Sequence, residues 1–475
     1  MNTHLSARRP HRKEERWGSP PSPPHPEPSP SWGTSSPWCG TRWPSCAPCP
    51  ATGTWYASDW APSPWSWRAT PPPSARSCAT TTPSTRAVSS YERAAEVGGQ
   101  GLVTCPHTLH RTQRRMCQPA FRTARLPDHT TAMTAQADTA SSGWHDGQTI
   151  DVPEEMMALA VRNLSATMFS DELPPQTLQH MPHDVDAIVA GFFGRLIMPG
   201  ALSHLPLPAT RRYEQALTRL RTTLAAVITD RRAHPGDQDD LLSRLLTRDP
   251  HHPATALTDK EITDQFITFF IAGAETVAST LSWALDLLTR HPDTLRDLRT
   301  EIDTVLAGRP VTYDDFPRLP LTGRVITETL RLYPAGWIYT RTATTDTTLA
   351  GTPVPAGTTL AYSPYLLHHN PAVHPDPERF DPDRWLPERA KATSRDHYIP
   401  FGSGPRKCIG DQFALTEATA TLATIVQNWH LHPLTHCPVR TQRATPVHPR
   451  DLRLRLNRRT PTTETSPPSH GTGPA

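Results

Sequence analysis

Apolar residues recur at helical spacing through most of the chain after about residue 89, and this pattern predicts a mainly α-helical body. Thr258, followed three residues later by Glu261, forms a capping-box pattern that opens a long apolar-rich helix, which ends before Pro292. Other helices are predicted over residues 152–169, 185–193, 209–230, 293–306, 321–332 and 410–429.

A different pattern fills residues 341–362, where short Thr- and Val-rich pieces are broken by Ala350-Gly351 and by Pro355-Ala356-Gly357. Glycine-containing turns between short extended pieces are typical of β-hairpins. We therefore expect one small β-sheet region inside an otherwise helical protein.

Residues 1–90 do not fit this pattern. They hold eight of the thirteen tryptophans and eighteen prolines, but Leu5 and Val88 are their only Leu, Ile or Val residues. Such a stretch cannot build a packed core. Translation of a GC-rich gene in the wrong frame, or from a wrong start, accounts for it best, and a low-complexity tail is the alternative. The chain is thus divided into an anomalous head (1–90), a folded domain (91–458) and a disordered tail (459–475).

Charge and hydropathy exclude several classes of protein. The net charge is only +3, and the excess of Lys and Arg lies in residues 1–90, so a nucleic-acid partner is not expected. No apolar run follows the basic N-terminus, so neither a signal peptide nor a membrane anchor is expected. The apolar stretch 266–288 contains Glu275 and several hydroxyl residues, which favours a buried helix over a membrane span. The scattered cysteines indicate a reducing, cytoplasmic location.

The strongest chemical signal surrounds Cys408. Gly402 and Gly404 would let the backbone approach a flat macrocycle closely, and Arg406 could reach an acidic group on it. Cys408 directly precedes a predicted helix, whose N-terminal N–H groups and dipole are expected to favour the thiolate. A lone cysteine is ordinarily an inert buried thiol, but here it lies within Phe401-Gly402-Ser403-Gly404-Pro405-Arg406-Lys407-Cys408-Ile409-Gly410.

This stretch resembles the haem-binding signature of cytochromes P450, Phe-x-x-Gly-x-Arg-x-Cys-x-Gly, and matches every position from Phe401 to Gly410. The resemblance implies the mainly α P450 fold and haem b (iron protoporphyrin IX) with Cys408 as the axial thiolate ligand. The family's N-terminal strands would be missing, because the anomalous head occupies their place. The implied reaction inserts one atom of O2 into a C–H bond. NAD(P)H-derived electrons would arrive through a separate ferredoxin and ferredoxin reductase, to a monomeric enzyme.

A second element of the resemblance is Ala272-Gly273-Ala274-Glu275-Thr276, midway along the long helix. Glycine and an acid both cost stability in a buried helix, so their presence requires a reason. By resemblance, the helix opens here, Thr276 orients dioxygen or a water, and Glu275 relays protons. The alternative is an ordinary polar pair on a partly exposed helix face.

Further residues are assigned by resemblance. Glu328 and Arg331, three residues apart on one helix face, would join Arg379 of the stretch 377–380 in a triad needed for folding and haem incorporation. His110, Arg114 and Arg341 would hold the haem propionates together with Arg406. The substrate pocket is expected to include Phe269, Ala272, Gly273, Trp337 and Ile338.

The stretches 101–107 and 363–370 resemble bacterial P450s that oxidise sesquiterpene hydrocarbons such as pentalenene. A terpene is therefore the expected substrate, with a fatty acid or a macrolide as alternatives. Two other functional classes stay open. One is a peroxide-using haem enzyme, against which Glu275 and Thr276 argue, and the other is a non-functional remnant that has lost the content of its N-terminal region.

Overall fold

The computed structural model describes residues 54–56, 68–70, 85–86, 89–170, 173–197, 207–247, 256–391, 395–434, 439–442 and 448–459. All of these lie in one compact unit, Cys49–Ala475. The predictions of an out-of-frame or disordered head and of a disordered tail fall mostly outside the described residues.

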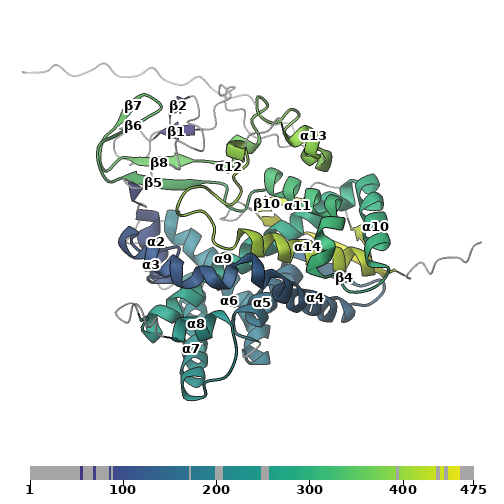
Figure 1. Ribbon diagram of the computed structural model, residues 1–475, viewed down its shortest axis with the longest axis horizontal. Helices are drawn as coiled ribbons and strands as arrows, with labels where there is room; N and C mark the ends of the chain where they lie inside the picture. The colour runs from purple at the N-terminus through teal and green to yellow at the C-terminus, as the bar shows by residue number, and fades with distance from the viewer. Residues whose placement is uncertain are drawn as a thin grey trace, which may run out of the picture. The chain divides into compact units, whose positions relative to one another are not determined.

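Helices dominate this unit, as the apolar spacing predicts (Figure 1). The predicted helices over 152–169, 209–230, 293–306, 321–332 and 410–429 are confirmed to within three residues at each end. The α-helices are α2 (Ser89–Gly98), α3 (His107–Cys117), α4 (Leu126–Ser142), α5 (Val152–Met168), α6 (Pro175–Ile197), α7 (Pro208–Ala233), α8 (Leu241–Leu246), α9 (Asp259–Arg290), α10 (Pro292–Leu306), α11 (Pro320–Leu332), α12 (Pro364–His368), α13 (Pro387–Ala390) and α14 (Asp411–Asn428). Short 3-10 helices are η2 (Gln118–Phe121), η3 (Thr123–Arg125), η5 (Tyr313–Arg318), η6 (Pro382–Trp385) and η7 (Arg395–His397).

The long helix α9 is the centre of the core. Thr258 and Glu261 form the expected capping box at its start. Its 32 residues span roughly 48 Å at about 1.5 Å per residue, and it packs against α5, α7, α11 and α14. Among the described residues it alone is long and apolar enough to cross a membrane, but 78% of its apolar stretch is buried inside the protein. The prediction of a buried core helix is therefore confirmed.

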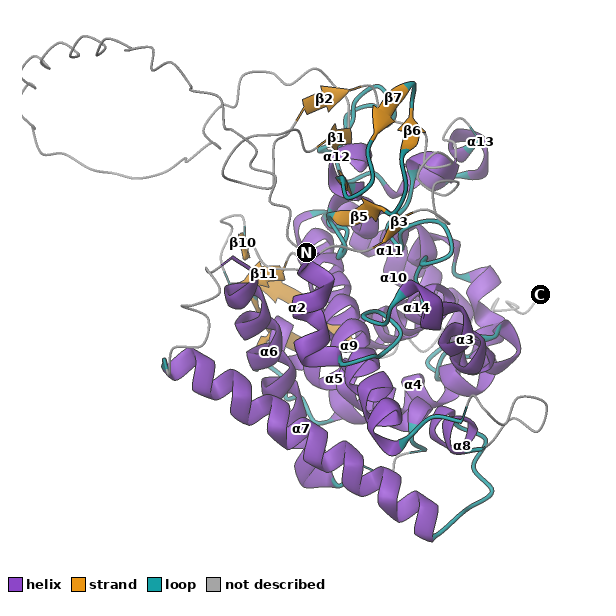
Figure 2. Ribbon diagram, turned by 90° about the vertical axis from the view of Figure 1, so that its left-hand side faces the viewer, coloured by secondary structure: helices purple, strands orange, loops and turns teal. Residues whose placement is uncertain are grey.

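Short antiparallel strands form the sheet region that the sequence predicts (Figure 2). Its largest sheet has the order β2 (Arg68–Thr70), β1 (Thr54–Tyr56), β8 (Thr359–Tyr362), β5 (Tyr339–Ala343) and β3 (Thr85–Arg86). In the neighbouring hairpin of β6 (Thr347–Leu349) and β7 (Thr352–Val354), Ala350 and Gly351 take φ of 48° and 80°, as a tight turn between twisted strands requires.

Two smaller sheets lie outside the stretch where the sequence predicts strands. In one, β12 (Arg453–Arg458) lies between β4 (Thr149–Asp151) and β9 (Trp429–Pro433). The other pairs β10 (Arg440–Gln442) with β11 (His448–Arg450). Strand β4 comes from a distant part of the chain, and the three-residue strands β4, β10 and β11 are too short to show an alternating pattern.

Two further details differ from the expectations. Strands β1, β2 and β3 lie within residues 1–90, where the composition predicts no packed core. Backbone pairing needs an extended chain and not aliphatic side chains, which is why composition could not reveal it. Helix α6 also begins ten residues before the predicted 185–193 and contains Pro182, a residue that normally ends a helix.

Candidate active site

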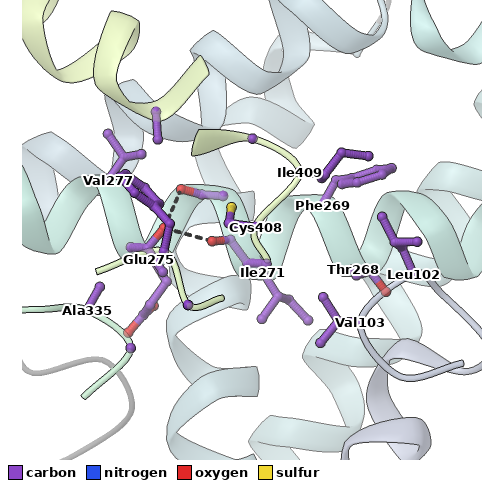
Figure 3. A pocket seen from close by; sticks show the side chains of 18 of the residues that line it. Leu102, Val103, Thr268, Phe269, Ile271, Glu275, Val277, Ala335, Cys408 and Ile409 are labelled. Atoms are coloured by element: carbon purple, nitrogen blue, oxygen red, sulfur yellow. Dashed lines mark hydrogen bonds between the residues drawn. The ribbon is translucent and has the colours of Figure 1, made fainter. Parts of the chain in front are cut away.

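A cavity of about 500 Å³ lies between α9 and the loop that precedes α14. Figure 3 shows Cys408 and Glu275 in this cavity with the apolar side chains of Leu102, Val103 and Phe269. The structure gathers the predicted catalytic, haem-binding and substrate residues on its wall with one exception, since Trp337 does not line it. The residues brought together are His110, Arg114, Phe269, Ala272, Gly273, Glu275, Thr276, Ile338, Arg341, Phe401, Arg406, Cys408 and Gly410.

The loop that carries Cys408 is fixed by its own backbone. The Cys408 N–H donates to the Phe401 carbonyl at 2.9 Å, and the Lys407 N–H donates to the Gly404 carbonyl at 2.9 Å. Gly402 and Gly404 have φ of 69° and 78°, a left-handed conformation that favours glycine. A Cβ at Gly402 would meet no atom of the chain nearer than 3.8 Å. The left-handed turn at Gly402 therefore explains why a glycine stands there, whereas crowding by other atoms of the chain does not.

The expected electrostatics of Cys408 require a correction. Helix α14 begins at Asp411, so the thiol lies close to its N-terminus as predicted. Burial nevertheless raises the pKa of the Cys408 thiol, and the Gly410 N–H and the charges of Arg114 and Lys407 only partly oppose this. The side chain is exposed only toward the cavity, where protein walls replace bulk water. In the chain alone these effects hold the pKa of Cys408 above its usual value, and a cation bound at the sulfur would lower it.

Three arginines carry positive charge onto the cavity wall. Arg114 donates to the Lys407 carbonyl at 2.6 Å and so ties α3 to the Cys408 loop. Arg406 donates to the Cys105 carbonyl at 2.9 Å, and Arg341 donates to the Thr340 carbonyl at 2.7 Å. Burial lowers the pKa of His110 to about 4, with the nearby Arg406 and Arg114 adding to the effect, so this imidazole is neutral near pH 7.

These residues fit haem b. Three guanidinium groups and a neutral imidazole can satisfy two carboxylates, and an apolar wall suits the porphyrin face. Cys408 would supply the one axial ligand from the protein, since the porphyrin supplies four nitrogens. No cluster of three or more His, Cys, Asp or Glu that could hold a metal occurs among the described residues, which agrees with a site built around a single cysteine.

The predicted opening of α9 is not found, because the helix runs unbroken from Asp259 to Arg290. The Thr276 hydroxyl donates to the Ala272 carbonyl at 2.8 Å, which keeps its lone pairs available toward the cavity. Gly273 has a packing reason, since a Cβ there would lie 3.1 Å from the Leu164 side chain of α5. The glycine therefore allows close contact of α5 and α9.

Glu275 is buried, with 3% of its surface exposed, and it has one partner. His448 on β11 contacts its Oε1 through Nε2, while Oε2 has no hydrogen-bond partner among the described residues. The sequence did not identify His448, because 173 positions separate it from Glu275. The alternative of a partly exposed polar pair is contradicted for Glu275 by this burial.

Two of the three predicted triad residues, Glu328 and Arg331, are paired in the structure, and the third is not the predicted one. Glu328 and Arg331 form a fully buried pair, with Arg331 Nη2 at 2.8 Å from Oε1 and Nε at 2.9 Å from Oε2. Arg379 contributes only its backbone carbonyl, which accepts from Arg331 at 3.1 Å, and its side chain is exposed. The third cation is Arg384, whose Nε lies 3.5 Å from Glu328 Oε1. Arg379 and Arg384 stand in similar local sequences five residues apart, so only the path of the chain distinguishes them.

A second buried carboxyl also lines the cavity and was not predicted. Burial raises the pKa of Glu417 on α14 to about 8, although the Asn163 amide of α5 donates to it at 2.9 Å. Nothing in the local sequence marks it, because its partner lies 254 positions away.

Comparison with known proteins agrees with this geometry. The cytochrome P450 family model matches residues 79–452. The chain is 45% identical to pentalenene oxygenase of Streptomyces avermitilis over 78% of its own length and 83% of that protein's. It is 43% identical to cyclooctatin synthase of Streptomyces melanosporofaciens, covering 74% of this chain and 76% of the relative.

A solved structure shares the fold as well. The haem domain of cytochrome P450DA superposes with a TM-score of 0.71 at 29% identity, covering 81% of this chain and 86% of that one. The family model, the relatives and the solved structure all identify the same family. The chain therefore belongs to the cytochrome P450 family, monooxygenases that use haem b, O2 and electrons derived from NAD(P)H.

Proposed function

We propose that this monooxygenase oxidises an apolar terpene hydrocarbon, with electrons delivered by a ferredoxin and its reductase. The observation that carries the proposal is the cavity, because a large part of its wall consists of aliphatic and aromatic side chains. Leu102, Val103, Ile188, Phe192 and Leu330 line it without a hydrogen-bonding group in their side chains. A hydrocarbon gains free energy there by leaving water and needs no polar partner.

The relatives support the same substrate class. Their names are pentalenene oxygenase, cyclooctatin synthase and cyclooctat-9-en-7-ol 5-monooxygenase, the last being 42% identical over 72% of this chain. A terpene agrees with these names and with the apolar wall better than a fatty acid does, since a fatty acid carries a carboxylate that the substrate end of the cavity would have to bind.

We assign the following roles to the residues. Cys408 would supply the thiolate that binds the haem iron, and Arg114, Arg341 and Arg406 with His110 would hold the propionates. Phe401 and Gly410 frame the Cys408 loop. Haem bound there would supply the iron that takes electrons one at a time, activates O2 and inserts one oxygen atom into a C–H bond.

Residues of α9 complete the chemistry. Thr276 presents its lone pairs to the cavity and orients O2 or a water, while Glu275 supplies protons. Phe269, Ala272, Gly273 and Ile338 shape the substrate space, and Phe269 is held in place by the Phe121 ring, with centroids 5.5 Å apart. Residues 91–458 constitute the haem domain, which works as a cytoplasmic monomer. The free thiols of Cys105 and Cys117 agree with a reducing compartment.

A paired substitution tests the proposal. The wild-type chain is expected to bind haem, to give the carbon monoxide difference spectrum of a thiolate-ligated iron, and to oxidise pentalenene with ferredoxin, reductase and NADPH. Cys408→Ser should abolish that spectrum and the product. Cys117→Ala is the matched control, because this buried thiol lies in the apolar core and does not line the cavity.

Three results would contradict the proposal. Failure of the wild type to bind haem would favour a non-functional remnant. Product formed with hydrogen peroxide but never with ferredoxin would favour a peroxide-using enzyme. An intact spectrum and turnover in Cys408→Ser would remove the axial role of this residue.

A further inference from the structure

The contact between Glu275 and His448 joins the cavity to the outside of the protein. Glu275 belongs to the middle of α9 and lines the cavity, as Figure 3 shows. His448 belongs to β11, which packs against α9 and α5. The side chain of His448 is 15% exposed and that of Glu275 is 4% exposed. The imidazole therefore lies between solvent and a carboxylate that solvent barely reaches.

The two oxygens of Glu275 have different surroundings. His448 contacts Oε1, and Oε2 is buried without a hydrogen-bond partner in the part of the chain that the structure describes. A buried carboxylate oxygen without a partner costs about 1–3 kcal/mol, so a purely structural pair would be expected to satisfy it. The adjacent residue, Thr276, also lines the cavity. Glu275 thus has one oxygen in contact with His448 and a second that is free to exchange partners, in a side chain that lines the cavity.

Oxygenation consumes protons at every turnover, so any proton held by a cavity group such as Glu417 would have to be replaced from solvent. One atom of O2 enters the substrate and the other leaves as water, so each turnover takes up two protons with its two electrons. We propose that these protons enter through His448, which passes them to Glu275. This inference rests on the proposed oxygenase function and names the group that connects its acid to solvent.

The transfer balances at each atom. Water at the exposed edge protonates His448 Nδ1, and the Nε2–H of the resulting imidazolium passes its proton to Glu275 Oε1. Rotation of the carboxyl group about its Cγ–Cδ bond then turns the protonated oxygen away from His448 and toward the cavity, where it releases the same proton and the carboxylate is restored. Rotation of the ring, or exchange of its proton with solvent, restores the starting tautomer. No oxidant or reductant is required beyond those of the oxygenation itself.

The variant His448→Gln separates this role from a structural one, because glutamine can still donate a hydrogen bond to Glu275 but cannot relay a proton. With ferredoxin, reductase and NADPH, product formed per NADPH oxidised is expected to fall about tenfold. With hydrogen peroxide instead, the rate is expected to stay within about twofold of wild type, because peroxide brings its own protons. His432→Gln, an exposed histidine of β9, is the matched control and should change neither assay.

A second readout does not depend on turnover. In haem-loaded protein labelled with ¹⁵N at histidine, the His448 resonance is identified by its loss in His448→Gln. Glu275→Gln is expected to shift that resonance and to leave the His432 signal in place. An unshifted resonance overturns the contact. Unchanged coupling in His448→Gln, or an equal loss with peroxide and with NADPH, overturns the relay. If the wild type oxidises no terpene, the substrate proposal fails, and the resonance still decides whether His448 is bound to Glu275.

Discussion

Two buried glutamates of this protein have opposite surroundings. Glu328 on α11 is fully buried, and its oxygens accept from Arg331 twice, from the Trp385 indole at 2.8 Å and from the Asp381 N–H at 3.1 Å. Glu275 on α9 is almost as buried, but it has His448 as its partner on one oxygen and no partner in the described chain on the other.

The difference follows from what each group has to do. A carboxylate that holds elements together is most useful when every lone pair is occupied, because an unpaired buried charge is strongly destabilising. Glu328 joins α11 to the loop that carries Arg384, far along the chain. A carboxylate that moves protons needs an oxygen that can exchange partners, and full satisfaction would prevent this. Incomplete hydrogen bonding at Glu275 therefore points to function.

The largest expected effect on stability is at Glu328, whose two oxygens both accept hydrogen bonds. Glu328→Gln replaces an oxygen by an amide nitrogen that faces donors, and it leaves Arg331 charged, buried and without its counter-ion. We expect the free energy of unfolding of the haem-loaded protein to fall by about 3–5 kcal/mol in chemical denaturation. A loss below about 1 kcal/mol would show that the backbone carbonyls around Arg331 are sufficient to hold it.

An intermediate effect on stability is expected for Arg384, the third charged residue of the triad. Arg379, five residues earlier, provides the matched comparison. Arg384→Ala removes the ion pair with Glu328 and a 2.7 Å hydrogen bond to the Pro375 carbonyl, which should cost about 2–3 kcal/mol. Arg379→Ala should cost less than about 0.5 kcal/mol, because its side chain is exposed and its carbonyl remains. The reverse order in the same denaturation experiment would restore Arg379 to the triad.

Of the two Glu→Gln substitutions, the one at the cavity is expected to have the smaller effect on stability. Glu275→Gln should change the free energy of unfolding by no more than about 1 kcal/mol, because the carboxylate it replaces is only half satisfied. Measuring the free energy of unfolding of Glu275→Gln and of Glu328→Gln in the same experiment compares an identical substitution at two buried positions. Equal losses at both positions would mean that Glu275 is also a structural group.

The sequence by itself determined the helical body, the long capped helix, the hairpin region and the chemistry of the Cys408 loop. These features are local: helical spacing, a capping box, turn glycines and a ten-residue signature each act within a few neighbouring residues. The resemblance to the P450 family, and not local spacing, singled out Thr276, Glu275 and the haem-binding cations, and all of them line one cavity in the structure.

Only the tertiary structure decided which distant groups meet. Arg384, and not Arg379, pairs with Glu328, and Trp337 does not line the cavity. His448 contacts Glu275, and Asn163 contacts Glu417, across long separations in the sequence. Tertiary packing also buries Cys408, and burial raises the pKa of its thiol against the effect of the helix N-terminus that the sequence shows. Contacts and desolvation depend on how the chain packs over hundreds of positions, and no local spacing encodes them.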